Sequence, residues 1–138
     1  MVIAIRRWAI AWASIFFLVS GSGCALLVAV GVGAGAAYGT MEYVKGELKQ
    51  AYAAPMEKTW NASLAAANTL KMKVVEKSID NLDQNRLISG QTEDKSDFQI
   101  ALEALGKDVT SVKVRIGLFG DEAYSKKIHD LIAQNLKK

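Results

Sequence analysis

Hydrophobic and polar residues alternate one by one along several stretches after residue 41, as in strands that bury only one face. We predict five such strands, at residues 42–52, 73–79, 86–92, 97–104 and 111–116. Short stretches rich in Asn, Asp and Gly separate the later strands, which favours antiparallel hairpins. The alternation also predicts which side chains face the core: Val44, Gly46, Leu48, Gln50, Tyr52, Val75, Ile79, Phe98, Ile100, Leu102, Ala104, Val112, Val114 and Ile116.

Two further stretches have the three- and four-residue hydrophobic spacing of amphipathic helices. The first covers about residues 55–70, with Pro55 suited to its first turn and Trp60 as its largest core side chain. The second follows Gly117–Gly120. Its hydrophobic stripe is made by Tyr124, Ile128, Leu131, Ile132 and Leu136.

The start of this second helix carries two favourable acids. Asp121 is a good N-cap, and Glu122 places a negative charge in the first turn, where the helix dipole favours it. The element order is then β-α-β-β-β-β-α. We predict an α+β domain in which one antiparallel sheet carries both helices on one face, preceded by an N-terminal hydrophobic leader helix.

The leader contains a stretch without any charged residue, Trp8 to Met41, directly after Arg6 and Arg7. Two basic residues, an apolar run and the small residues 20–23 follow in the order of a secretory signal. Cys24 comes next. This order resembles a bacterial lipoprotein signal, in which the cysteine becomes the mature N-terminus and carries acyl chains, although Gly21 stands where such signals usually have leucine.

The resemblance divides the chain into three segments. We predict a signal peptide at residues 1–23, a lipidated Cys24 with a Gly/Ala-rich apolar tether at 24–41, and an α+β envelope domain at 42–138. Two or three acyl chains anchor a protein stably where one does not. Because Ala25 rather than Asp follows the cysteine, the resemblance points to the periplasmic face of the outer membrane in a two-membrane cell.

The same stretch also suits an uncleaved anchor. About 20 apolar residues span a bilayer, and Trp8–Leu27 would serve. Gly31, Gly35 and Gly39 recur every four residues, so on a helix they would form a smooth face for helix pairing in lipid. Either form leaves the basic pair in the cytoplasm and the domain outside it.

Nearly the whole chain resembles a family of small bacterial lipoproteins of unknown function. The residues that carry the resemblance are the leader with its Gly/Ala-rich continuation, Tyr43–Leu48, Ala54-Pro55 with Trp60, and Gly117–Glu122. The resemblance implies an envelope location and a small α+β domain. It implies no activity and no catalytic residue.

Charge gives no reason to expect a nucleic-acid partner. The chain of 138 residues has 17 Lys and Arg against 14 Asp and Glu, a net charge of +3. Two of the cations, Arg6 and Arg7, lie in the leader, so the chain from Cys24 onward has 15 basic and 14 acidic residues. A nucleic-acid-binding protein needs a clustered basic face, which this interspersed pattern does not predict.

Chemistry-bearing residues are few. One cysteine and one histidine, His129, cannot build a His/Cys metal site, and we expect His129 to be a surface residue. The acids at 80–83 and 93–94 lack the ligand spacing of a calcium loop, so we expect solvated turns. We therefore predict no metal, no cofactor and no enzymatic activity.

The best candidate for a functional loop is the connection before the last helix. Two glycines flank Leu118 and Phe119, and Asp121 and Glu122 follow, so this loop could form a recognition tip. We predict a membrane-anchored, non-enzymatic structural or interaction module that contacts an unknown envelope protein. An open sheet face with Tyr43, Lys45, Glu47, Lys113 and Arg115 would suit such a surface.

The alternative function is a binding domain for a small apolar ligand. Such a ligand would be held between the sheet and the helices. It would require an unfilled interior among Trp60, Phe98, Ile100 and Tyr124.

Overall fold

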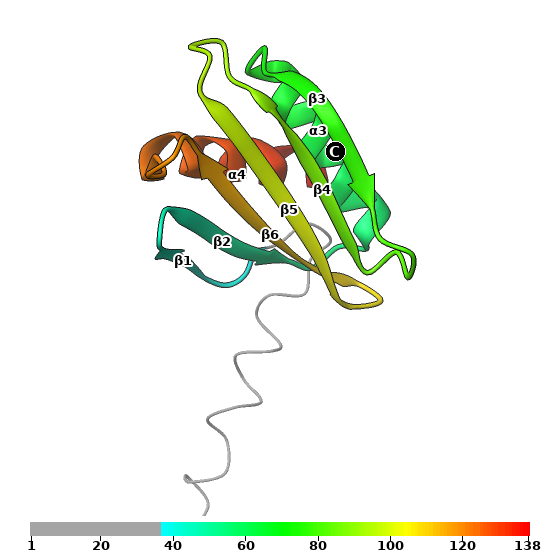
Figure 1. The fold of residues 1–138 in the computed structure, drawn as a ribbon. Coiled ribbons are helices and arrows are strands. Elements are labelled where there is room, and N and C mark those ends of the chain that lie inside the picture. Colours follow the sequence, from blue (N-terminus) through cyan, green and yellow to red (C-terminus); the bar gives the residue numbers. More distant parts are fainter. Residues whose placement is uncertain (1–36) are drawn as a thin grey trace, which may run out of the picture. The chain divides into compact units, whose positions relative to one another are not determined.

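The computed structural model describes residues 37–138 (Figure 1). In chain order the elements are β1 (Ala37–Val44), β2 (Glu47–Tyr52), α3 (Met56–Thr69), β3 (Lys73–Ile79), β4 (Asn85–Gln91), β5 (Asp97–Gly106), β6 (Val109–Ile116) and α4 (Glu122–Leu136). The six strands form one sheet in the order β1-β2-β6-β5-β4-β3, and every neighbouring pair is antiparallel. The predicted α+β class is confirmed, whereas the predicted leader helix lies outside the described residues.

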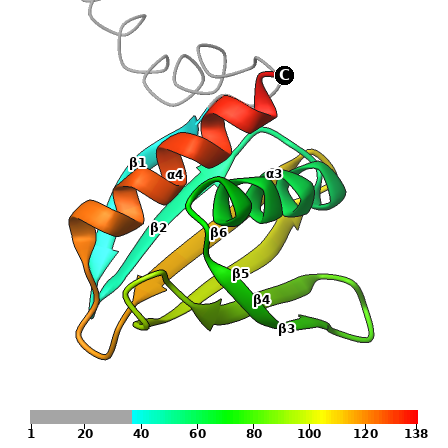
Figure 2. The same cartoon turned by 90° about the horizontal axis from the view of Figure 1, so that it is seen from above.

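Both helices lie on the same face of the sheet and pack against each other (Figure 2). Helix α4 lies over β2 and β6, and α3 contacts β5 most, with further contacts to β3 and β6. The other face of the sheet is left uncovered by either helix (Figures 1 and 2). This two-layer arrangement requires strands with one apolar face, and the alternation in β5 and β6 provides it.

The first predicted strand is wrong, because residues 42–52 contain a hairpin rather than one strand. Lys45 and Gly46 both have positive φ, 52° and 85°, as the two-residue turns that suit the twist of antiparallel strands require. The turn pairs Val44 with Glu47, so Val44 is exposed instead of sharing the core side with Leu48. Strand β1 begins at Ala37, so residues 37–41, which the sequence suggested as tether, lie in the sheet.

The predicted inward residues of β3 are also wrong. Val75 and Ile79 are 69% and 54% exposed, whereas Val74 packs against the core. The pairing of β3 with β4 shifts register between Val74 and Glu76. Such a bulge interrupts the alternation of side chains between the two faces of the sheet. Val75 lies in this bulge, so its side chain does not follow the predicted alternation.

The core between sheet and helices contains most of the other predicted side chains. Leu48, Gln50 and Tyr52 of β2 are buried as predicted. From β5, β6, α3 and α4 the buried hydrophobic residues include Trp60, Ala66, Ala67, Phe98, Ile100, Leu102, Val112, Val114, Ile116, Ile128, Ile132 and Leu136. Helix α3 follows Pro55, and after Trp60 its buried residues are short: Ala62, Ser63, Ala66 and Ala67. Asn135 of α4 donates a hydrogen bond to the Ala62 carbonyl of α3.

Candidate functional site

The loop between β6 and α4 exposes two large hydrophobic side chains. Leu118 is 77% and Phe119 is 87% exposed, the two highest values among the large exposed hydrophobic residues of the described part. Directly after them, Asp121 caps α4, because its Oδ1 accepts a hydrogen bond from the Tyr124 backbone N–H at 2.9 Å. The predicted cap is confirmed, and Glu122 opens the first turn of the helix as expected.

The backbone of this loop is held on three sides. The Gly117 N–H donates to the Asp97 carbonyl at 2.7 Å, and the Arg115 guanidinium donates to the Leu118 carbonyl at 2.6 Å. On the third side the loop lies against the β1–β2 turn. Gly46 and Gly120 approach so closely there that a side chain on either would meet backbone of the other loop. Leu118 and Phe119 are therefore presented to solvent by a braced loop.

The uncovered face of the sheet carries interspersed charges beside this loop. Glu47 of β2 lies directly opposite Arg115 of β6, and Lys49 lies opposite Lys113. With Glu42, Val44 and Lys45 these residues line a surface hollow of about 340 Å³. The predicted open face is confirmed for Glu47, Lys113 and Arg115.

The prediction for this face is wrong for Tyr43. Tyr43 is opposite Leu48, whose side chain lies on the helix-covered side of the sheet. Lys45 is in the turn rather than in a strand.

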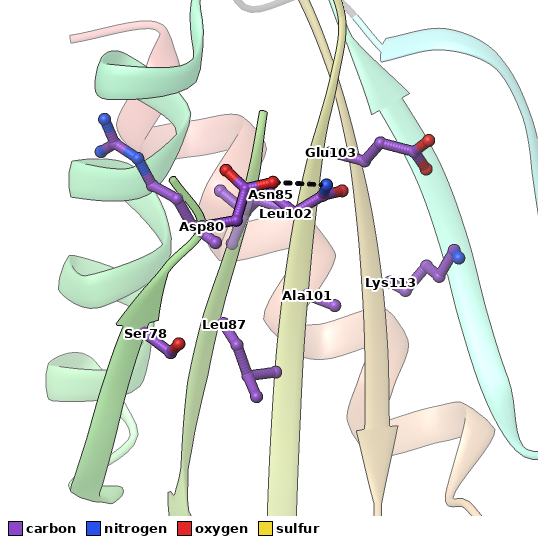
Figure 3. A pocket seen from close by; sticks show the side chains of 9 residues that line it. Ser78, Asp80, Asn85, Leu87, Ala101, Leu102, Glu103 and Lys113 are labelled. Atoms are coloured by element: carbon purple, nitrogen blue, oxygen red, sulfur yellow. Dashed lines mark hydrogen bonds between the residues drawn. The ribbon is translucent and has the colours of Figure 1, made fainter. Parts of the chain in front are cut away.

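A second hollow of about 240 Å³ lies on the same face (Figure 3). Leu87 and Ala101 contribute apolar side chains, and Asp80, Glu103 and Lys113 contribute charges. The Asp80 carboxylate already accepts bonds from the Asn85 side chain and the Gln84 backbone, both at 2.8 Å. These hydrogen bonds, led by the one from Asn85, lower the pKa of Asp80. The Asp80 carboxylate is therefore ionised, and its hydrogen bonds stabilise the turn between β3 and β4.

His129 is not a surface residue, contrary to expectation, because its side chain is fully buried beneath β2. Its Nε2 lies 2.9 Å from the Leu48 carbonyl oxygen. A carbonyl only accepts, so Nε2 carries the proton and donates it. Nδ1 then accepts from the Tyr52 hydroxyl at 2.7 Å, and the same hydroxyl lies 3.1 Å from the His129 carbonyl.

This buried pair is neutral at physiological pH. Burial lowers the pKa of His129, against opposing effects of the Leu48 hydrogen bond and Asp130. Burial, followed by the charge of Asp130, raises the pKa of Tyr52. Both ring nitrogens have protein partners, and the ring has no exposed surface, so the pair fastens α4 to β2 rather than presenting a base to a substrate.

Residues 7–135 match the model of a family described as a protein of unknown function, DUF3568. The chain belongs to the DUF3568 family. The match includes the whole charge-free stretch, Trp8–Met41, as well as nearly all of the described residues. No curated protein matches the chain.

Within residues 37–138, no group of three or more His, Cys, Asp and Glu side chains could hold a metal ion. In the same range no helix is long and apolar enough to cross a membrane. The most exposed large hydrophobic side chains of the described residues are those of the loop at Leu118 and Phe119, and the charged sheet face lies beside this loop.

Several predicted site residues of the DUF3568 chain lie outside the described residues. Cys24, Gly31 and Gly35 are among them, so lipidation and helix pairing stay predictions. Gly39 is described, and it lies in β1. It therefore belongs to the sheet and not to a helical face shared with the other two glycines.

Sequence reasoning also missed Arg86 as a structural residue. Its Nε and Nη2 donate to the two oxygens of Asp83 at 2.7 and 2.9 Å, and its Nη1 donates to Glu57 at 2.8 Å. The guanidinium carbon also lies 5.4 Å from the centroid of the Trp60 ring. Arg86 thereby links the β3–β4 turn to α3. Only the pairing of distant segments reveals this role.

Proposed function

We propose that this protein is an exported bacterial lipoprotein whose domain acts as a non-enzymatic interaction module of the cell envelope. Acyl chains on Cys24 hold it to membrane lipid, at the periplasmic face of the outer membrane in a two-membrane cell. The domain contacts another envelope component through the Leu118–Phe119 loop and the charged sheet face.

The order of residues in the leader carries the anchoring half of the proposal. Arg6 and Arg7 precede an apolar run, small residues and the single cysteine of the chain. An exported free thiol is a liability in an oxidising compartment, and an acylated one is not. The family match covers residues 7–135, so the leader from Arg7 onward lies within the matched region.

The exposed loop supports the interaction half. Large hydrophobic side chains that are held out in solvent by a braced backbone cost little ordering entropy when they are buried against a partner. The interior offers less support for the alternative apolar-ligand site, because Trp60, Phe98 and Ile100 are themselves packed into one core cluster.

Mass spectrometry of the protein purified from membranes tests the anchor. We expect a chain that begins at Cys24 and carries acyl groups. Cys24→Ala should block cleavage and leave a precursor that is larger by residues 1–23 and still attached through the apolar stretch. An intact Met1 together with an unmodified Cys24 would contradict lipidation and favour the uncleaved anchor.

A further inference from the structure

Three loops gather at one end of the sheet. They are the β1–β2 turn at Lys45 and Gly46, the β4–β5 turn at residues 92–96, and the β6–α4 loop at 117–121. In both views the β6–α4 loop lies between the other two (Figures 1 and 2). The close approach of Gly46 and Gly120 joins it to the first loop, and the bond from Gly117 to Asp97 joins it to the start of β5. We call this region the loop end.

The centre of the loop end is apolar. Leu118 and Phe119 project from the middle loop, and Val44 beside the β1–β2 turn is half exposed. One buried aromatic side chain contributes about 150–250 Å² to an interface. A standard interface buries about 800 Å² per partner, so this apolar centre needs its charged surroundings to complete a contact.

The two sides of the centre differ in charge. On the β1–β2 side, the basic residues Lys45, Lys49, Lys113 and Arg115 line a hollow whose two acids are Glu42 and Glu47, so this side has a net positive charge. On the β4–β5 side, Glu93 and Asp94 are exposed in the turn, and Asp121 lies at the end of the middle loop. The charges of these three carboxylates act on Tyr124. After burial, their charges are what raises its pKa. Lys95 is the one cation of that turn.

An apolar centre with a basic flank on one side and an acidic flank on the other is self-complementary. A two-fold axis through the centre sets each basic flank against the acidic flank of the other copy, as an isologous interface requires. An anionic lipid surface fits less well, because the acidic flank would face it. We propose that the loop end binds a second copy of this chain, with Phe119 of each copy close to the two-fold axis.

This inference rests on the proposed function, because it names the partner of the proposed interaction surface. The contact is small, so we expect weak association in dilute solution. Confinement to one membrane raises the effective concentration of the copies, and the proposed anchor would supply it.

Site-specific photocrosslinking in cells tests the contact. The full-length chain is made with two different epitope tags, and a benzophenone amino acid replaces Phe119. We expect a crosslinked species of twice the chain mass that contains both tags. The matched control replaces Lys107, which is exposed at the opposite end of β5 and β6, and should give none. Crosslinks at 119 to other proteins alone, equal yields at both positions, or no crosslink at either would overturn the proposal.

Charge reversal tests the two-fold arrangement. Lys45→Glu and Asp94→Lys should each lower the yield of the two-tag species, and the double variant should recover it, because the reversed flanks again oppose each other. If the double variant loses as much two-tag yield as the two single variants together, the two-fold arrangement is contradicted. Phe119→Ala should weaken self-association at least about tenfold, as loss of a central anchor does.

Membrane fractionation of the same cells separates this inference from the proposed function. Two-tag crosslinks from a protein found only in the soluble fraction would refute the anchor and retain the self-contact. A membrane-bound, acylated chain without such crosslinks would retain the anchor and refute the self-contact.

Discussion

Trp60 and Arg86 illustrate how single side chains fasten separate parts of this fold. Trp60 enters the core from α3, and Arg86 covers its ring while binding Asp83 and Glu57. Glu57 and Asp83 are well exposed, so their ion pairs are screened by solvent and add little stability by themselves. The burial of Trp60 should therefore dominate the stability of this corner.

Trp60→Ala should lower the free energy of unfolding by about 3–5 kcal/mol, as truncation of a large core residue does. The matched control is Phe119→Ala, since Phe119 is a large aromatic residue that is exposed to solvent. Its effect on unfolding should stay within about 0.5 kcal/mol. Urea unfolding followed by circular dichroism measures both. A loss below about 1 kcal/mol for Trp60→Ala would mean that its burial is not stabilising.

His129 should make the stability of the protein depend on pH. Burial lowers its pKa in the folded state below the ordinary 6.5, so the unfolded chain binds the proton more readily. The stabilisation is complete above pH about 6.5 and is lost as the pH falls from there through the folded pKa. The unfolding free energy, measured between pH 7.5 and about 5.5, should fall over that range.

The control for this titration is simple because the chain has a single histidine. His129→Gln should be less stable at neutral pH, yet it should lack the slope in this window. Asp80 and Asp83 also have lowered pKa values, but from an ordinary value of 3.8, so they titrate at more acidic pH. An equal slope in the variant would assign the pH dependence to other groups.

The β1–β2 turn and the loop before α4 are in contact through two glycines, Gly46 and Gly120. The hairpin of β1 and β2 closes at Lys45-Gly46, and its turn packs on the loop that leads into α4. Gly120 has a φ of 82°, which L side chains rarely adopt. Its position against the backbone of Gly46 leaves no room for a side chain. These two glycines couple the first hairpin to the last helix.

Gly120→Ala should destabilise the protein by about 1–3 kcal/mol, because it combines backbone strain with a steric clash. Gly106→Ala is the matched control. No atom lies near the site of its new side chain, and Gly106 is not among the residues with positive φ. It should be neutral or stabilise by about 0.4–1 kcal/mol. Chemical denaturation distinguishes them, and similar losses would show that the loop contact is unimportant.

In the domain that residues 37–138 form, two helices cover one side of a six-stranded sheet, and β1 is an edge strand of that sheet. Residues 37–41 of β1 pair with the end of β2 through Ala37 and Tyr38. A domain cut at residue 42 would therefore lose the first part of this edge strand. The core residues of β2, β5 and β6 would all remain.

A fragment of residues 42–138 should fold, but with lower stability than one of residues 37–138. Each intramolecular hydrogen bond contributes about 0.5–1.5 kcal/mol net, so we expect a loss of about 1–2 kcal/mol. Circular dichroism should show mixed helix and strand for both fragments, and thermal unfolding measures the difference. A disordered spectrum for the shorter fragment would show that the first half of β1 is essential for folding.

Local pattern by itself determined most of the architecture. Alternation in β5 and β6, and helical spacing after Pro55 and Asp121, identified these elements and most of their buried hydrophobic residues, because burial of one face imposes a period of two or about 3.6 residues. The leader, which charge and hydropathy predict, lies outside the described residues and stays a prediction. The exposure of Leu118 and Phe119 was anticipated from the glycines around them.

Tertiary structure decided what the pattern could not. The turn at Gly46 was hidden inside an alternating run, and the register shift after Val74 displaced Val75 to the surface. The burial of His129 depends on Tyr52 and Leu48, 77 and 81 residues away in the chain. Polar residues enter a core only where such distant partners satisfy their hydrogen bonds, and pairings at that separation leave no periodic trace in the sequence.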